Sequence, residues 1–281
     1  MNRTRKDWTD IKTNDSWAIF KIMSEFVEGY ERMSKIGPCI SIFGSARTKP
    51  ENKYYQLGVE VALKLTQAGY GIITGGGPGI MEAGNKGAHL AGGTSVGLNI
   101  TLPFEQHDNP YIDKDKSIDF DYFFVRKVMF VKYSQGFVVM PGGFGTLDEF
   151  FEAFTLIQTK KIDQFPLILV GRSFWSGLME WVKNTLLEEG NISPEDLDMV
   201  HVVDTEDEVL SILNNFGGRI FEQVSSPKEM IFEHNINMNK HTSIILSFKN
   251  PSDIFSYCNK NNINAMIEPN SDLWEQLIQK N

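Results

Sequence analysis

Short apolar runs alternate with amphipathic helical patterns along most of this chain, and that alternation limits the folds open to it. The runs predicted to be strands cover residues 39–43, 71–74, 95–100, 119–124, 137–140, 166–170 and 200–203. The segments predicted to be helices cover residues 54–67, 79–90, 126–134, 147–159, 174–187 and 206–214. This order is typical of an α/β protein with a Rossmann-like, doubly wound parallel sheet and helices on both faces. Ligands of such sheets bind at the carboxyl ends of the strands, near the point where the strand order reverses.

Two segments flank the predicted sheet. Residues 15–33 carry large apolar side chains at helical spacing, which predicts an amphipathic helix that serves as a brace or as an oligomer contact. Beyond residue 218 two weaker β runs, at 242–248 and 264–267, are each followed by a helical pattern. The predicted organisation is an N-terminal helical extension at 1–35, a Rossmann-like domain at 36–218 and a small α/β appendage at 219–281.

The composition is that of an ordinary globular protein. With 281 residues, of which 41% are hydrophobic, the chain can bury a large core. A formal net charge of −9 argues against a protein that grips a nucleic-acid backbone and favours small-molecule partners. Cys39 and Cys258 lie far apart and outside any Cys/His cluster, so we expect reduced thiols in a cytoplasmic protein and no metal site. The sequence predicts neither a signal peptide nor a membrane span.

A glycine-rich turn follows the strand predicted at 137–140, with the sequence Pro141-Gly142-Gly143-Phe144-Gly145-Thr146-Leu147-Asp148-Glu149. Gly142, Gly143 and Gly145 have no Cβ atoms, so the backbone N–H groups can approach an anion closely. The helix predicted to begin near Thr146 points its unpaired N–H groups and the positive end of its dipole at the same place. The turn therefore predicts a phosphate site with a carboxylate, Glu149, beside it.

A purely structural interpretation of the same residues stays open. Thr146 and Glu149 also fit a capping box, in which Thr146 caps the helix and the Glu149 carboxylate accepts the N–H of the capping residue. The glycines would then serve only a tight turn between strand and helix.

A second glycine-rich turn follows the strand predicted at 71–74 and contains Gly75, Gly76 and Gly77. It does not fit the GxGxxG pattern of dinucleotide-binding proteins, and neither turn has the GxxxxGK[ST] spacing of a P-loop. A dinucleotide oxidoreductase and a P-loop NTPase are therefore poorly supported. Two such turns at strand ends would flank one ligand, and we predict that these three glycines and Pro141 line it.

Several polar residues are predicted to lie at the same edge of the sheet. Ser45 could donate to a phosphate or a ribose hydroxyl, while Arg47 fits a ligand contact and a solvated loop equally well. Arg126 and Lys127 begin a predicted helix and point about 100° apart, so one would face a ligand and the other solvent, unless both are surface charges. Glu105 would reach the same crevice. No HExxH, GxSxG or Cys/His arrangement supports a protease or a serine hydrolase.

These motifs resemble those of the LOG (Lonely Guy) family. The shared features are PGGxGTxxE, here Pro141–Glu149, an upstream arginine-lysine pair, here Arg126 and Lys127, and a GGG turn, here Gly75–Gly77. The resemblance covers residues 36–215 and implies a nucleotide-binding catalytic domain. It implies a phosphoribohydrolase that cleaves AMP or cytokinin nucleotides to the free base and ribose 5-phosphate. The N-terminal helix and the C-terminal extension depart from the compact members, which leaves the preference for cytokinin nucleotides open.

The resemblance implies a role for each matching residue. Arg126 and Glu149 would be the catalytic pair, and Lys127 and Glu105 would lie near the substrate. The residues assigned to the 5′-phosphate are Gly142, Gly143, Gly145 and Thr146. Breaking the C1′–N bond develops oxocarbenium character, which a carboxylate can stabilise while it orients ribose hydroxyls or water. Arg126 stays protonated, so it would fix Glu149 or stabilise charge on the departing base. No cofactor is expected.

Other functions stay open at this point. A non-catalytic nucleotide-binding or nucleotide-sensing protein would keep the glycine-rich turns, although the presence of both Arg126 and Glu149 favours the enzyme. A decarboxylase, the label of many family members, would need a pyridoxal-phosphate lysine. No such site is marked around Lys127, Lys132, Lys160 or Lys161. A single-stranded nucleic-acid binder conflicts with the net charge of −9. The apolar helix and the resemblance both favour a homodimer or a higher homo-oligomer.

Overall fold

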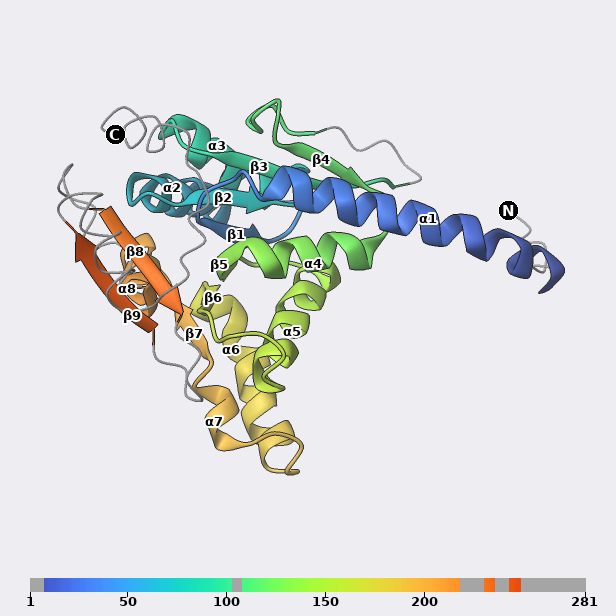
Figure 1. The fold of residues 1–281 in the computed structure, drawn as a ribbon. Helices are drawn as coiled ribbons and strands as arrows, with labels where there is room; N and C mark the ends of the chain where they lie inside the picture. Colours follow the sequence, from blue (N-terminus) through green and yellow to red (C-terminus); the bar gives the residue numbers. More distant parts are fainter. Residues whose placement is uncertain (1–7, 103–107, 218–229, 236–242, 249–281) are drawn as a thin grey trace, which may run out of the picture. The chain divides into compact units, whose positions relative to one another are not determined.

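A computed structural model describes residues 8–102, 108–217, 230–235 and 243–248, with side chains for residues 17–102 and 108–216. The chain divides into two compact units, Met1–Phe216 and Gly217–Asn281. Figure 1 labels their helices and strands in chain order.

The first unit is built on a seven-stranded parallel sheet with the order β4-β3-β2-β1-β5-β6-β7 (Figure 1). The strands are β1 (Cys39–Phe43), β2 (Gly71–Thr74), β3 (Ser95–Ile100), β4 (Ser117–Phe120), β5 (Ser134–Val139), β6 (Leu167–Val170) and β7 (Val200–Val203). The helices are α1 (Trp8–Met33), α2 (Lys53–Gln67), α3 (Ile80–Leu90), α4 (Phe123–Tyr133), α5 (Phe144–Gln158), α6 (Arg172–Trp181), the π-helix η1 (Val182–Leu187), α7 (Pro194–Leu197) and α8 (Glu206–Gly217). This confirms the predicted Rossmann-like α/β fold. The strand order reverses between β1 and β5, which is therefore the switch point.

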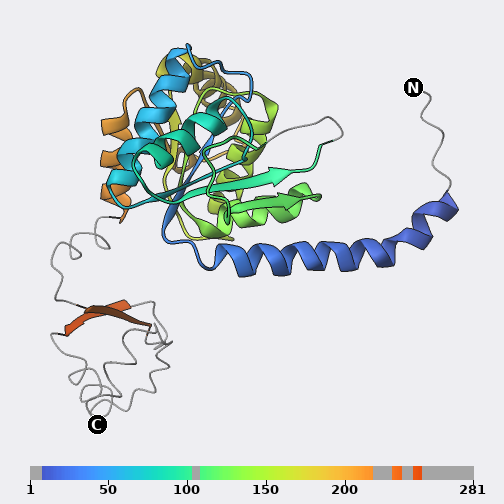
Figure 2. The same cartoon turned by 90° about the horizontal axis from the view of Figure 1, so that it is seen from above.

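Both faces of the sheet are buried, which explains why its strands read as continuous apolar runs. In β1, Cys39 and Phe43 belong to the core cluster on one face, while Ile40 and Ile42 belong to the cluster on the other. Residues of α1, α4, α5 and α6 complete the first cluster, and residues of α2, α3 and α8 complete the second (Figure 2). The alternation of side chains along each strand thus places one layer of helices on each face.

The region between β4 and α4 differs from its prediction. The strand predicted at 119–124 ends at Phe120, and α4 begins at Phe123 rather than at Arg126. A contact from far away in the sequence explains the change: the Glu25 carboxylate of α1 accepts the backbone N–H groups of Asp121 and Tyr122 at 3.1 and 3.2 Å. Glu25 thereby satisfies two backbone groups just before α4 begins, which overrides the strand propensity of the local aromatic run.

Helix α1 lies along one side of the first unit (Figure 2). Ile22 and Phe26 pack against the core, and Arg32 Nη2 donates to the carbonyl oxygen of Ser117 at 2.6 Å. Further large apolar side chains, at positions beside and opposite the docked ones, remain exposed on this helix. They are Trp17, Ile19, Phe20, Met23, Val27 and Tyr30. The helix therefore has one apolar face docked on its own domain and a second apolar face in contact with solvent.

The second unit contains an antiparallel pair of strands, β8 (Met230–Asn235) and β9 (Ser243–Phe248). The β run predicted at 242–248 matches β9, whereas the run predicted at 264–267 lies outside the described residues. In the part of the chain that the structure describes, no helix combines the length and apolarity needed to cross a bilayer.

Buried side chains hold the turn between β2 and α3. Thr74 Oγ1 accepts the N–H of Gly76 at 3.0 Å and donates to Asn85 Oδ1 at 2.5 Å. Asn109 Nδ2 donates to the carbonyl oxygen of Gly76 at 3.1 Å. Gly76 has φ +75°, and a Cβ at this position would lie 1.5 Å from Asn99 Oδ1. The turn therefore requires glycine here both for its backbone conformation and for its packing.

Two glycine substitutions separate these requirements. Gly92 has a similar φ of +70° but nothing within 4 Å of the position of a Cβ. We expect Gly92→Ala to lower the free energy of unfolding by about 1–2 kcal/mol, from left-handed backbone strain alone. Gly76→Ala should lower it by about 3 kcal/mol or more, because its methyl group also overlaps Asn99. Urea unfolding measures both values, and equal losses would contradict the packing requirement.

Candidate functional site

The carboxyl ends of three strands meet around the backbone of Ser45, which follows β1. The Ser45 N–H donates to the carbonyl oxygen of Pro141 at 3.0 Å, and the Ser45 carbonyl oxygen accepts the N–H of Ile80 at 3.1 Å. Gly79 permits this approach, since a Cβ there would lie 2.4 Å from Ser45 O. The Ser45 hydroxyl accepts the N–H of Arg47 at 3.1 Å. The glycine-rich turns after β2 and β5 are therefore joined at the switch point through the Ser45 backbone.

Helix α5 begins at Phe144, three residues before the predicted start at Leu147. Gly143 is its N-cap and makes no side-chain capping bond. Thr146 consequently lies inside the first turn and does not cap the helix, so the capping-box interpretation of Thr146 and Glu149 is wrong. The first N–H groups of α5 lack a side-chain cap, which leaves the end of the helix suited to an anion.

The three glycine positions of this turn differ in what surrounds them. A Cβ on Gly142 would lie 2.0 Å from Thr146 Oγ1, so packing inside the protein requires glycine at this position. Gly143 and Gly145 have nothing within 4 Å of the position of a Cβ, and both have negative φ angles. Neither packing nor backbone conformation demands glycine at these two positions. Their bare backbone leaves open space at the N-terminus of α5, as a bound phosphate would need.

Arg126 on α4 and Glu149 on α5 form a buried ion pair. Arg126 Nη2 lies 3.8 Å from Glu149 Oε1, and the two side chains are 12% and 7% exposed. The Arg126 guanidinium lies over the rings of Phe123 and Phe130, at 5.2 and 5.7 Å, and its buried Nε has no hydrogen-bond partner in the described structure. A separation of 3.8 Å is too long for a hydrogen bond. The guanidinium therefore retains donors for a ligand.

Burial sets the proton affinity of this pair. It raises the pKa of Glu149 to about 7, against the opposing charges of Lys127 and Arg126. Burial also lowers the pKa of Arg126, although a guanidinium stays protonated at neutral pH. The Glu149 carboxyl group thus changes its charge near neutrality, a property that is common among residues that act in acid–base or electrostatic catalysis.

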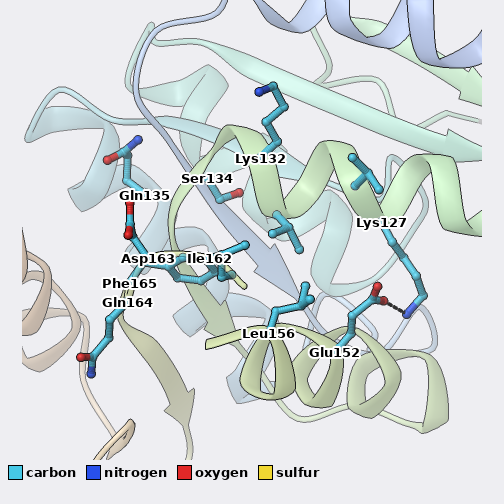
Figure 3. Close-up of a pocket in the computed structure, with 12 residues that line it drawn as sticks. Lys127, Lys132, Ser134, Gln135, Glu152, Leu156, Ile162, Asp163, Gln164 and Phe165 are labelled. Carbon is cyan, nitrogen blue, oxygen red and sulfur yellow. Dashed lines mark hydrogen bonds and ion pairs between the residues drawn. The ribbon is translucent and has the colours of Figure 1, made fainter. Parts of the chain in front are cut away.

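Lys127 is the neighbour of Arg126 in α4 but contacts other partners. Its Nζ lies 2.8 Å from Asp148 Oδ2 and 2.5 Å from Glu152 Oε2, both on α5. Figure 3 shows the pair of Lys127 and Glu152 at one end of a cavity of about 600 Å³ between α4 and α5. Both adjacent cations are therefore paired with carboxylates, which argues against the interpretation of Arg126 and Lys127 as surface charges.

Among the glycines of the second turn, Gly75 approaches the ion pair. A Cβ on Gly75 would lie 3.8 Å from Arg126 Nη1. Gly76 and Gly77 are buried, and their carbonyl oxygens each accept a hydrogen bond from Asn109 Nδ2 at 3.1 Å. Gly75 therefore faces the site, while Gly76 and Gly77 make hydrogen bonds that stabilise the conformation of the turn.

Some residues of the site were not predicted from the sequence. Asp148 and Glu152 are one helical turn apart, a spacing that predicts a shared face and would have marked them as partners for a cation. Asn109 carried no comparable signal, because its partners come from a distant turn. Glu105 lies outside the described residues, and its role stays a prediction. Within the described residues, no group of three or more His, Cys, Asp or Glu side chains is placed to hold a metal ion.

The sequence is similar to those of several known proteins. A family model described as "Possible lysine decarboxylase" matches residues 81–213. The chain is 33% identical over 159 residues to the cytokinin riboside 5′-monophosphate phosphoribohydrolase of Mycobacterium tuberculosis, which covers 55% of this chain and 82% of that protein. It is 24% identical over 180 residues to cytokinin riboside 5′-monophosphate phosphoribohydrolase LOG3 of Arabidopsis thaliana, covering 63% and 82% of the two chains.

Solved structures include a further similar protein, the molybdenum cofactor carrier protein of Chlamydomonas reinhardtii. It aligns with a TM-score of 0.48 and 22% identity, over 65% of this chain and 99% of that one. The 33% identity to the mycobacterial protein, across 82% of its length, is the stronger relationship. Together with the PGGxGTxxE motif at Pro141–Glu149, it shows that the chain belongs to the LOG (Lonely Guy) family.

Proposed function

We propose that this protein hydrolyses a nucleoside 5′-monophosphate to the free base and ribose 5-phosphate. The observation that carries the proposal is the buried pair of Arg126 and Glu149, which lies where the two glycine-rich turns converge. The relatives named cytokinin riboside 5′-monophosphate phosphoribohydrolase support this chemistry. AMP and cytokinin nucleotides are the substrates we propose, since they differ only in the substituent on the adenine.

The phosphate would bind at the N-terminus of α5. Gly143 and Gly145 leave room there, and the free N–H groups and the helix dipole favour a negative charge. Glu149 lies on the second turn of the same helix, so one helix would hold both the phosphate and the carboxylate that acts on the ribose. Backbone groups would therefore fix the distance between the phosphate and the reacting carbon.

Hydrolysis breaks the C1′–N bond, and its electron pair leaves with the base. Positive charge develops on the ribosyl ring, and an ionised Glu149 would stabilise that charge or orient the attacking water. The water oxygen bonds to C1′, and a water proton balances the charge on the departing base. Arg126 would stabilise the base as it leaves or hold Glu149 in place, because a guanidinium does not give up its proton.

A non-catalytic nucleotide sensor of the same fold is the alternative. Such a protein would need the phosphate site but would not need a carboxylate to act on C1′. A carboxylate buried close to a phosphate repels it and weakens binding. The pairing of Glu149 with Arg126 therefore favours the enzyme over the sensor.

The description of the matching family also suggests a lysine decarboxylase, whose pyridoxal phosphate would require a lysine that loses its proton readily. Lys127 does not fit this role. Burial lowers the pKa of Lys127, but hydrogen bonds to Asp148 and Glu152, together with the negative charges of Glu149 and Glu152, outweigh burial and raise the pKa. The other lysines considered are exposed, namely Lys132, Lys160 and Lys161. These side chains give the decarboxylase no support.

Substitution of the ion pair tests the hydrolase directly. We expect the wild type to release base and ribose 5-phosphate from AMP or from a prenylated AMP. Glu149→Gln and Arg126→Met should each lower kcat by about 100-fold or more, because each removes a charge that acts on the transition state. Mass spectrometry of the products measures both the rate and the preferred base.

Glu60→Gln, an exposed residue of α2, is the matched control and should retain the wild-type rate. AMP that binds and raises the melting temperature without any release of base would contradict the hydrolase and support the sensor.

The proton on Glu149 should control both rate and stability. If ionised Glu149 is the active form, kcat/KM for AMP rises with pH through about 7. The folded pKa lies above its ordinary value of 4.5, so the linked stabilisation is complete below pH 4.5 and is lost as pH rises through about 7. Glu149→Gln should remove up to about 1.4 kcal/mol per pH unit from this slope. Denaturant unfolding at several pH values measures the slope, and parallel curves would contradict the assignment.

We also propose that the exposed face of α1 binds a second copy of the chain. Phe20, Met23, Val27 and Tyr30 follow the alternating three- and four-residue spacing of paired helices. With Trp17 and Ile19 they expose on the order of 600–700 Å² per chain, so two chains would bury an area within the range of stable dimers. Copies related by a twofold axis would present the same face to each other.

Charged substitutions on this face test the dimer. Phe20→Asp combined with Val27→Asp should convert a dimer to a monomer, because two carboxylates would be buried at the interface. Light scattering after size exclusion measures the mass. Glu60→Lys on α2 is the control and should leave the dimer intact. A monomeric wild type, or a double variant that still dimerises, would contradict the proposal.

A further inference from the structure

We infer that Lys127 is a positioning residue: by binding Asp148 and Glu152 it fixes α5 against α4, and so sets the separation of Glu149 from Arg126. The catalytic meaning of this inference rests on the proposed hydrolase function. The contacts themselves do not depend on that function.

The order of residues on α4 and α5 places the bonds of Lys127 on both sides of Glu149. Arg126 and Lys127 are consecutive in α4, and Asp148 and Glu152 bracket Glu149 in α5. The pair of Arg126 and Glu149 is long, at 3.8 Å, and cannot fix the geometry by itself. The bonds from Lys127, at 2.8 and 2.5 Å, are short and are made on both sides of Glu149. They are therefore the contacts that can hold the Glu149 carboxylate at a fixed position relative to Arg126.

The pocket beside these bonds increases their share in fixing α5 relative to α4. A half-open pocket of about 600 Å³ lies between α4, α5 and residues 162–165, with Val128, Val131 and Leu156 among its lining (Figure 3). On the side of this pocket the two helices are therefore not packed directly against each other. Lys127 and Glu152 close one end of this space, and the Lys127 side chain is only 12% exposed. The Asp148 and Glu152 side chains are 60% and 36% exposed, so solvent screens the pairs from the carboxylate side and the buried ammonium group is what limits their motion.

The same lysine also balances the charge around Glu149. Burial raises the pKa of Glu149, the charges of Lys127 and Arg126 lower it, and those of Glu152 and Asp148 raise it. Lys127 thus offsets the two carboxylates that it binds. Removal of Lys127 and removal of Glu152 should consequently change the charge state of Glu149 in opposite directions.

A role of Lys127 as a direct phosphate ligand fits these contacts less well. Its ammonium group already donates to two carboxylates, and a phosphate would have to compete with them or sit next to them. Arg126 Nη2, in contrast, lies 3.8 Å from Glu149 Oε1, beyond hydrogen-bond distance. The Nη groups of Arg126 therefore keep donors for a substrate, whereas the ammonium group of Lys127 is already engaged.

Carbon-13 NMR titration of the glutamate carboxyl groups tests the inference in the free protein. The Glu149 signal is assigned by its loss in Glu149→Gln. We expect Lys127→Met to move the Glu149 midpoint upward by about one unit, because a positive charge has been removed. Glu152→Gln should move the midpoint downward, and Lys127→Arg should lie closer to the wild type than Lys127→Met. Lys132→Met, an exposed lysine beside the same cavity, is the matched control and should leave the midpoint unchanged.

Calorimetry with inorganic phosphate separates positioning from binding. Lys127→Met should change the phosphate Kd by less than about threefold, while kcat for the nucleotide falls at least about tenfold. The inference is overturned if the Glu149 midpoint stays fixed, or if Lys127→Met and Glu152→Gln move it in the same direction. It is also overturned if phosphate affinity falls tenfold with the midpoint unchanged. Failure of the hydrolase proposal is distinguishable, since it appears as absence of turnover in the wild type, whatever the titration shows.

Discussion

Two backbone hydrogen bonds of Ser45 determine where everything else in the site lies. They join the turn after β5 to the first turn of α3, and they form because Gly44 and Gly79 let the chains approach. A Cβ on Gly44 would lie 2.5 Å from a methyl carbon of Ile80, so a larger residue would push the two turns apart. The junction joins the turn that leads into α5 to the turn that leads into α3, and so brings the free N–H groups of α5 and the Gly75 backbone to the same edge of the sheet. The parallel sheet supplies the junction, since β1 lies between β2 and β5.

The site contains two charged groups, Arg126 and Glu149, at buried positions where a charge lowers the free energy of unfolding. Arg126 and Glu149 are nearly inaccessible to water, yet they stand too far apart to satisfy each other with a hydrogen bond. Structures maintain such an arrangement when surrounding contacts fix it, and here Lys127, Asp148 and Glu152 provide those contacts. Burial raises the pKa of Glu149 to about 7, so its carboxyl group changes charge near neutrality. The separation of 3.8 Å leaves donors on Arg126 for a substrate. Arg126 and Glu149 thus lower the folding stability of the protein, and the same two groups are free to interact with a ligand.

The sequence predicted the parts of this arrangement that are local. Apolar runs and helical periodicity predicted the strand and helix order, and the glycine-rich strings predicted two turns at the same edge of the sheet. What it missed depends on contacts between distant segments. The capping of the backbone before α4 by Glu25 shifted the start of that helix, and the early start of α5 at Phe144 removed the capping box expected for Thr146. The pairing of Lys127 with Asp148 and Glu152 requires two helices to be placed in space, so a linear pattern could not distinguish it from a phosphate contact.

A crystal structure of the Glu149→Gln variant with AMP bound would locate the phosphate and the ribose in the site. We expect the phosphate to lie on the N–H groups of Gly143, Gly145 and Thr146. We also expect C1′ to face residue 149 and the Arg126 guanidinium to contact the nucleotide. A phosphate bound instead by Lys127, or a ribose that lies away from residue 149, would contradict both the proposed function and the positioning role of Lys127.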